Sequence, residues 1–147
     1  MTRRIADIEY EQMLQSRHAI AQHSRGAILD RSAYLLLSRI AAEGPKSIGE
    51  LSEIFRLDAS TLQRQTGAAV SAGLLTRTAD PEGGLAKKFS LTDAGTQQLL
   101  AHRSRSVQAL DAILSSWSDA EVAAFADMLH RFNEDIERYS ARRRAAV

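Results

Sequence analysis

The stretch from residue 47 to residue 91 changes its hydrophobic period along its length, and the rest of the chain is organised around it. Ile48, Leu51 and Ile54 recur at helical spacing, and residues 56–58 then interrupt that pattern. A second helical pattern runs from residue 59 to residue 72, and two short extended segments follow it. The stretch is therefore predicted to form a short helix, a tight turn, a second helix and a β-hairpin.

The second of these helices has two chemically different faces. At 100° per residue, one side is apolar or small, and the opposite side is small and hydrogen-bonding around a single arginine. The inward residues are Leu62, Thr66, Ala69, Val70 and Gly73, and the outward residues are Ser60, Arg64, Ala68 and Ser71. Because small polar side chains allow close approach to base edges, this helix is predicted to enter a major groove.

Capping signals place the ends of these elements. Ser47 and Glu50 have the spacing of a capping box, and Asp58 stands where it can cap the second helix. Gly73 can adopt the left-handed conformation that ends a helix. Helix, turn, helix and hairpin follow one another in the order of a winged helix-turn-helix, so we expect a mainly α fold with a small β-hairpin wing.

One face of the hairpin can pack on the helices. Phe89 and Leu91 alternate with Lys88 and Ser90, so the apolar pair is expected to face the helices and Lys88 to face outward. At the tip, residues 80–84 combine a proline that fixes φ with glycines that permit positive φ. The pattern predicts a short wing with an exposed lysine.

Longer helices are predicted on both sides of this stretch. Residues 5–23 carry a ragged helical pattern, and Asp30 can cap a more apolar helix after it. Thr92 can cap a long helix whose apolar series extends to Trp117, and residues 118–121 have the spacing of a second capping box. The chain is therefore expected to be helical at both ends.

The last helix carries the most regular apolar period in the chain. Its apolar residues lie three and four positions apart, which is the heptad spacing of helices that pair. Together with Ile8 of the first helix, the predicted homodimer interface comprises Val122, Phe125, Leu129, Phe132, Ile136 and Tyr139. The alternative is that these helices pack within the monomer.

We expect a single domain over residues 1–147, with a DNA-binding lobe at 30–92 and dimerisation helices at 5–24 and 93–141.

The composition limits the possible functions. The formal net charge is only +1 with 25% charged residues, so a nucleic-acid-binding surface must be local. No cysteine is present, which excludes disulfides and thiolate chemistry. The N-terminal residues lack an apolar core of signal-peptide length, and no segment approaches the roughly 20 apolar residues that cross a bilayer. We expect a cytoplasmic protein with no membrane partner.

The sequence offers no catalytic or metal-binding pattern. His18 and His23 are five positions apart and do not share a helical face, while His102 and His130 are isolated. There is no nucleophile elbow, phosphate loop or dinucleotide fingerprint. We therefore expect no metal site, no cofactor and no enzymatic activity.

Four sequence motifs resemble those of the MarR (multiple antibiotic resistance regulator) family of bacterial transcription factors. They are LDAST at residues 57–61 leading to Arg64, AGLL at 72–75, DPE at 80–82 and LTDAG at 91–95. The resemblance covers the whole chain. It implies a homodimeric repressor that binds a palindromic double-stranded DNA operator and is released by a small phenolic or lipophilic effector.

The resemblance also implies functional residues. It places Ser60, Thr61, Gln63 and Arg64 in the major groove and the wing along the minor groove. The predicted DNA-binding set is completed by Ser47, Arg77, Lys87 and Lys88. By location alone, an effector pocket would draw on His18, Tyr34, Arg39, His102 and Arg103.

The wing departs from the family pattern. Relatives commonly carry an aspartate and arginines after the Asp-Pro motif, whereas this chain has Gly83, Gly84 and Leu85. The minor-groove contact is then either lost or transferred to Lys87 and Lys88, which are point charges and not planar forks. Fewer neutralised phosphates predict a shallower salt dependence of DNA binding. The competing hypothesis is a winged-helix protein-interaction module with weak or no specific DNA binding.

Overall fold

The computed structural model describes residues 2–23 and 29–147, and it divides the chain into two compact units, Met1–Arg105 and Ser106–Val147. The element order agrees with the sequence-based prediction of a mainly α fold with a two-stranded wing. The elements are α1 (Ile5–His23), α2 (Arg31–Glu43), α3 (Ile48–Phe55), α4 (Ala59–Ser71), β1 (Leu75–Thr78), β2 (Lys88–Leu91), α5 (Asp93–Ile113) and α6 (Asp119–Ala145).

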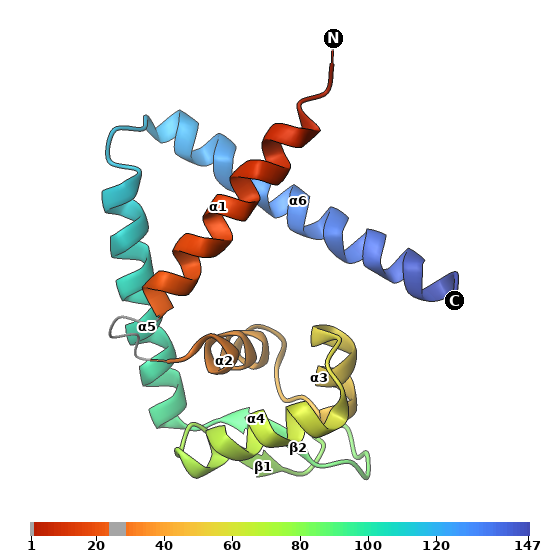
Figure 1. The fold of residues 1–147 in the computed structure, drawn as a ribbon. Coiled ribbons are helices and arrows are strands. Elements are labelled where there is room, and N and C mark those ends of the chain that lie inside the picture. The colour runs from red at the N-terminus through yellow and green to blue at the C-terminus, as the bar shows by residue number, and fades with distance from the viewer. Residues whose placement is uncertain (1, 24–28) are drawn as a thin grey trace. The chain divides into compact units, whose positions relative to one another are not determined.

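The core of the first unit lies where α2, α3, α4 and the hairpin meet (Figure 1). Each element contributes a leucine that is at most 2% exposed: Leu36 and Leu37 from α2, Leu51 from α3, Leu62 from α4 and Leu75 from β1. The prediction that Leu62 faces inward is confirmed. Burying these leucines fixes the three helices and the hairpin as one winged-helix unit.

The capping residues act at the predicted ends. Asp30 accepts the Ala33 backbone N–H at 2.8 Å, and Gly73 adopts a φ angle of +77° at the end of α4. The N–H of Glu121 bonds the Ser118 hydroxyl, and the Glu121 carboxylate accepts the Ser118 N–H, which completes the predicted capping box of α6. Local sequence therefore determines most helix boundaries.

One predicted boundary is wrong. We expected the fifth helix to extend to Trp117, but α5 ends at Ile113. The Trp117 backbone N–H donates to the Leu114 carbonyl at 2.9 Å, which closes a tight turn before α6. Leu114 and Trp117 are therefore apolar residues of the turn that follows α5, and they are not part of the helix.

The wing is an antiparallel pair of strands attached to the start of α3. Leu75 pairs with Leu91 at the base, and Thr78 pairs with Lys88 at the outer end. Phe89 also exchanges two backbone hydrogen bonds with Lys46, at 2.8 and 3.3 Å, on the segment just before α3. The wing is thus joined by backbone contacts to the helix-turn-helix.

The LTDAG motif joins the wing to α5. The Thr92 hydroxyl donates to the Gly73 carbonyl and accepts the Gly95 N–H, and the Thr92 N–H donates to the Leu74 carbonyl. A Cβ atom on Gly95 would lie 2.1 Å from the Leu74 carbonyl oxygen, so only glycine allows this close approach. The motif therefore fixes where α5 leaves the winged-helix unit.

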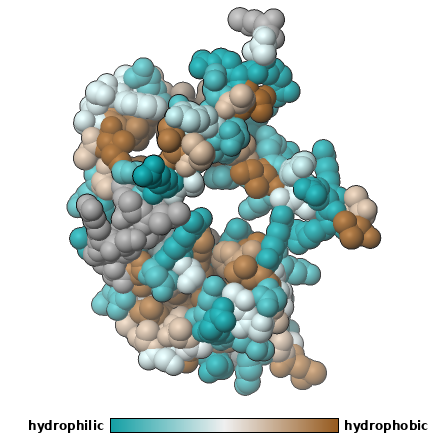
Figure 2. All heavy atoms as spheres, viewed as in Figure 1, coloured by the Kyte–Doolittle hydropathy of each residue, from teal (hydrophilic) through white to brown (hydrophobic). Residues whose placement is uncertain are grey.

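In the second unit, the apolar residues at heptad spacing along α6 form an apolar seam, and most of its side chains are exposed. The Trp117 and Phe125 rings lie 5.5 Å apart at its start, and Val122 is half-buried there. The other seam side chains are at least 37% exposed: Phe125, Leu129, Phe132, Ile136 and Tyr139. Figure 2 shows brown, hydrophobic atoms at the surface of the long helices. None of the described helices combines the length and the hydrophobicity that a membrane-spanning segment needs.

Candidate nucleic-acid interface

Helix α4 has the two faces that its sequence predicts. Leu62, Thr66 and Ala69 are at most 5% exposed, and the Thr66 hydroxyl is satisfied by donating to the Leu62 carbonyl at 2.7 Å. The predicted outward residues Ser60, Arg64, Ala68 and Ser71 are exposed, and so is Gln63 at the edge of that face. The prediction that Gly73 faces inward is wrong: α4 ends at Ser71, and Gly73 is exposed in the turn that follows. Because the buried face cannot rotate outward without losing core contacts, the polar face is held toward solvent.

The first turn of α4 is organised by Asp58. This residue is the N-cap by position, but its carboxylate does not cap a backbone N–H. It accepts hydrogen bonds from the Thr61 hydroxyl and, at 2.7 Å, from the Ser60 hydroxyl. The hydrogen bond from Thr61, and to a lesser extent the one from Ser60, holds the pKa of Asp58 below its ordinary value of 3.8. Both hydroxyls keep free lone pairs that can accept from a base amino group.

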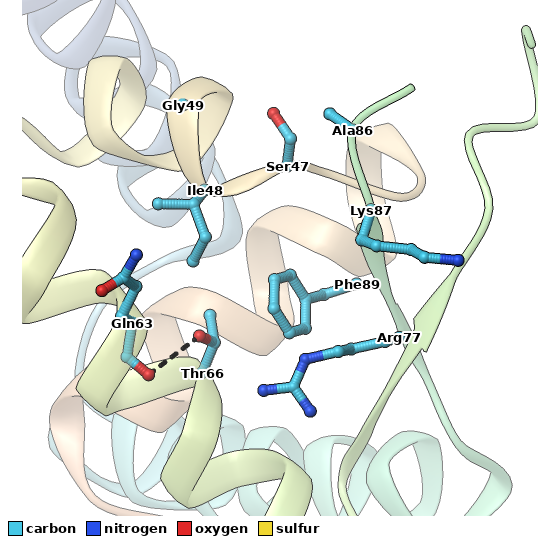
Figure 3. Close-up of a pocket in the computed structure, with 9 residues that line it drawn as sticks. All are labelled: Ser47, Ile48, Gly49, Gln63, Thr66, Arg77, Ala86, Lys87 and Phe89. Atoms are coloured by element: carbon cyan, nitrogen blue, oxygen red, sulfur yellow. Dashed lines mark hydrogen bonds between the residues drawn. The ribbon is translucent and has the colours of Figure 1, made fainter. Parts of the chain in front are cut away.

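A hollow of about 640 Å³ lies between α4, the start of α3 and the wing (Figure 3). Four predicted DNA-binding residues line it: Ser47, Gln63, Arg77 and Lys87. The Arg77 guanidinium carbon lies 5.5 Å from the centroid of the Phe89 ring, within cation–π range. Figure 3 shows the Arg77 side chain reaching under Phe89 toward α4, whereas the Lys87 side chain extends away from α4. The fold thus brings together residues up to 40 positions apart.

The expectation that Lys88 faces outward is wrong. Its ammonium lies 2.9 Å from Glu50 Oε1 and 3.6 Å from Asp80 Oδ1, and its side chain is only 14% exposed. The hydrogen bond from Lys88 to Glu50, aided by the nearby Asp80 charge, raises the pKa of Lys88 above its ordinary 10.5. Two carboxylates therefore hold the Lys88 ammonium against the start of α3, and Lys87 remains the exposed lysine of the pair.

Glu50 also departs from its expected role. The Ser47 hydroxyl accepts the Glu50 N–H at 3.2 Å, which is half of a capping box. The Glu50 carboxylate, expected to return to the Ser47 backbone, instead binds Lys88, lies 3.7 Å from the Lys46 ammonium and accepts the Ser47 hydroxyl. The Lys88 hydrogen bond holds the pKa of Glu50 below its ordinary 4.5. Sequence reasoning missed this contact because residues 50 and 88 share no local pattern.

Two of the five effector-pocket candidates lie against each other. The Tyr34 ring of α2 and the His102 ring of α5 have centroids 4.3 Å apart, and His102 is 5% exposed. His102 Nδ1 accepts the Leu29 backbone N–H at 3.3 Å. Arg39 instead lies 3.5 Å from Glu43 on its own helix. His18 and Arg103 are exposed on α1 and α5, and the hollow in Figure 3 is lined by none of these five residues.

Comparisons with known proteins agree with this geometry. The family model described as the MarR family matches residues 29–84. The chain is 36% identical to the HTH-type transcriptional regulator YxaD of Bacillus subtilis (strain 168) over 130 residues, which are 86% of this chain and 91% of YxaD.

Solved structures share the fold across nearly the whole chain. A MarR family protein from Bacillus stearothermophilus has a TM-score of 0.74 and 21% identity over 93% of this chain and 99% of that chain. BpsR of Bordetella bronchiseptica has a TM-score of 0.64 and 14% identity over 89% and 99%. The winged helix, the family match and the similarity to YxaD together show that this chain belongs to the MarR family of transcriptional regulators.

Proposed function

We propose that this protein is a homodimeric repressor that binds a palindromic operator through α4 and the wing and is released by a small molecule. The observation that carries the proposal is the exposed face of α4, where Ser60 and Arg64 lie opposite a fully buried Leu62 and Gln63 is exposed at the edge. A surface helix without a partner more often carries glutamate and lysine there. A face of small polar residues around one arginine suits the major groove.

Within this proposal, Arg64 makes the principal base contact. A guanidinium can donate two hydrogen bonds to one guanine, and a contact of that kind is worth about 1–3 kcal/mol of discrimination. Ser60, Thr61 and Gln63 read neighbouring positions. Ser47, Arg77 and Lys87 surround the hollow beside α4, where they suit the DNA backbone on the wing side.

The exposed seam of α6 supports a homodimer. Its apolar side chains have heptad spacing and are at least 37% exposed from Phe125 to Tyr139, and Ile8 on α1 is 51% exposed. A two-fold dimer would present two α4 helices to half-sites about 34 Å apart. In this proposal residues 30–92 form the DNA-binding lobe, and residues 5–24 and 93–141 carry the dimer contacts.

The Tyr34–His102 contact is the candidate effector region. It joins α2 of the DNA-binding lobe to α5, so a ligand that separates these two rings would change how the lobe is held. DNA binding by BpsR, which shares the fold, is regulated by 6-hydroxynicotinic acid. An aromatic effector of similar size is proposed here, acting as a population shift between two dimer states.

The test is a mobility-shift titration on the DNA that flanks the protein's own gene. Wild type should bind with an affinity that falls with salt, and Arg64→Ala should lose roughly 1–3 kcal/mol of binding. Arg143→Ala, which removes a positive charge from the exposed end of α6, is the matched control and should bind nearly as wild type. Equal binding by wild type and Arg64→Ala would refute the groove contact.

The second candidate function is a winged-helix interaction module. It is favoured by the wing tip, where Leu85 is fully exposed in the place that relatives give to arginine. The absence of salt-dependent binding to any fragment of the flanking DNA would select this function over the repressor.

A further inference from the structure

We propose that Glu50, Lys88 and Asp80 form an ionic brace that sets the orientation of the wing against α3, and that Lys88 is a positioning residue and not a phosphate contact. The brace concerns the free protein. Its consequence for DNA affinity rests on the proposed function, and the experiments below separate the two.

The brace connects three segments that are distant in sequence. Glu50 lies in the first turn of α3, Asp80 begins the loop at the end of the wing, and Lys88 opens β2. The Lys88 ammonium lies between the two carboxylates, at 2.9 Å from Glu50 Oε1 and 3.6 Å from Asp80 Oδ1. Lysine has three donors and no acceptor, so one ammonium can serve both acids.

Burial distinguishes this cluster from an ordinary surface ion pair. The side chains of Lys88 and Asp80 are only 14% and 13% exposed, whereas that of Glu50 is 39% exposed. By contrast, the Arg4–Asp7 pair on α1 has side chains 84% and 56% exposed. An ammonium that is mostly withdrawn from water and paired with two carboxylates is poorly placed to neutralise a DNA phosphate.

The loop is shaped around the Asp80 carboxylate. Asp80 Oδ1 accepts the Glu82 N–H at 2.9 Å, and a Cβ atom on Gly84 would lie 2.2 Å from Asp80 Oδ2. Gly83 has a φ angle of +86°, which favours glycine. Gly84 therefore leaves room for Asp80 to turn back toward Lys88, and Gly83 supplies the positive φ angle of the turn.

The brace also decides which charges face outward. Lys88 is held against Glu50 and Asp80, whereas Lys87, which precedes β2, is exposed beside the hollow. On the partner strand, Arg77 pairs with Phe89, next to the braced position. A wing released from α3 would still carry Lys87 and Arg77, but without a fixed approach to the groove.

The sign of a charge-removing substitution separates positioning from plain electrostatics. Glu50 lies beside Ser47, which lines the hollow proposed to face DNA, so neutralising Glu50 should strengthen DNA binding if only net charge matters. If the brace positions the wing, Glu50→Gln should weaken binding although it removes a negative charge. Lys46, 3.7 Å from Glu50 Oε2, is the other cation beside this carboxylate.

The first experiment is amide hydrogen exchange on the free, full-length protein. Glu50→Gln and Lys88→Met should each raise exchange across residues 78–88 by about two- to five-fold, the range expected for losing an ion pair of this kind. Glu53→Gln makes the same charge change at an exposed position on α3 and is the matched control. Wing exchange in Glu50→Gln equal to that in Glu53→Gln would overturn the brace.

The second experiment measures operator affinity against salt concentration. Lys87→Met should lower the slope of log affinity against log salt by about one, whereas Lys88→Met should lower affinity with the slope unchanged. The double variant Glu50→Gln with Lys88→Met should bind about as weakly as either single variant, because both remove the same contact. Tighter binding by Glu50→Gln, or a slope change in Lys88→Met equal to that of Lys87→Met, would overturn the role in DNA binding. Failure of wild type to bind DNA removes the proposed function, and the exchange experiment still decides the brace.

Discussion

Helix α4 and the distal wing (residues 78–88) both face the proposed DNA, but different forces hold them. The inward face of α4 is apolar and closed to water, with Leu62 at 0% exposure. The distal wing instead depends on ion pairs between Lys88 and two carboxylates. Apolar burial hardly responds to salt or pH, whereas ion pairs are screened and titrate. Helix α4 is therefore held in a fixed position by the core. The position of the distal wing is expected to change with salt concentration and pH.

The largest expected effect comes from removing the apolar anchor of α4. Leu62→Ala should lower the free energy of unfolding by about 2–5 kcal/mol, because it deletes a fully buried side chain and leaves a cavity. Urea unfolding at one fixed protein concentration measures it. Ser71→Ala, on the exposed face of the same helix, is the control and should change stability by less than about 0.5 kcal/mol. A loss below about 1 kcal/mol in Leu62→Ala would contradict the view that this face is the anchor.

An intermediate effect is expected from restoring an arginine to the wing. Leu85→Arg should steepen the slope of log operator affinity against log salt by about one and raise affinity at low salt, because it adds one phosphate-neutralising charge. Leu85→Gln has similar reach without the charge and should leave the slope unchanged. Equal slopes for the arginine and glutamine variants would mean that the wing tip does not approach the DNA.

The smallest expected effect is the pH dependence of the brace. The pKa of Glu50 is held below its ordinary 4.5, so its contribution to stability is fully present above that value and is lost as the pH falls through the lowered pKa. The pKa of Lys88 is raised above 10.5, so its contribution persists up to that pH and is lost only above it. The stability difference between wild type and Glu50→Gln should therefore be constant near neutral pH and should shrink in acid.

This pH dependence can be measured by urea unfolding of both proteins at about pH 7, 5 and 3. Glu53→Gln again serves as the control, since Glu53 is exposed on the same helix. A difference between wild type and Glu50→Gln that grows as the pH falls would contradict the assignment of Glu50 to the brace.

The prediction succeeded where neighbouring residues determine the structure. Asp30 and Ser118 cap helices at the predicted positions, and the inward and outward faces of α4 follow from its 100° period. It failed at Lys88, where strict alternation along a strand suggested an outward lysine. Alternation reports which face a residue lies on, but not whether charges from another element draw a long side chain back over the edge.

The sequence by itself determined the winged helix-turn-helix, the faces of its second helix and the family to which the resemblance pointed, because periodicity, caps and turn residues act over a few positions. Only the tertiary structure decided that Lys88 binds Glu50 and Asp80, that Asp58 holds the Ser60 and Thr61 hydroxyls instead of capping α4, and that Tyr34 meets His102. Most of these contacts join residues far apart in the chain, and where they are local, as at Asp58, several hydrogen-bond partners compete. The long-range contacts depend on how the folded segments approach one another, and the contacts of Asp58 depend on which neighbouring donor it binds. Hydrophobic periodicity contains neither kind of information.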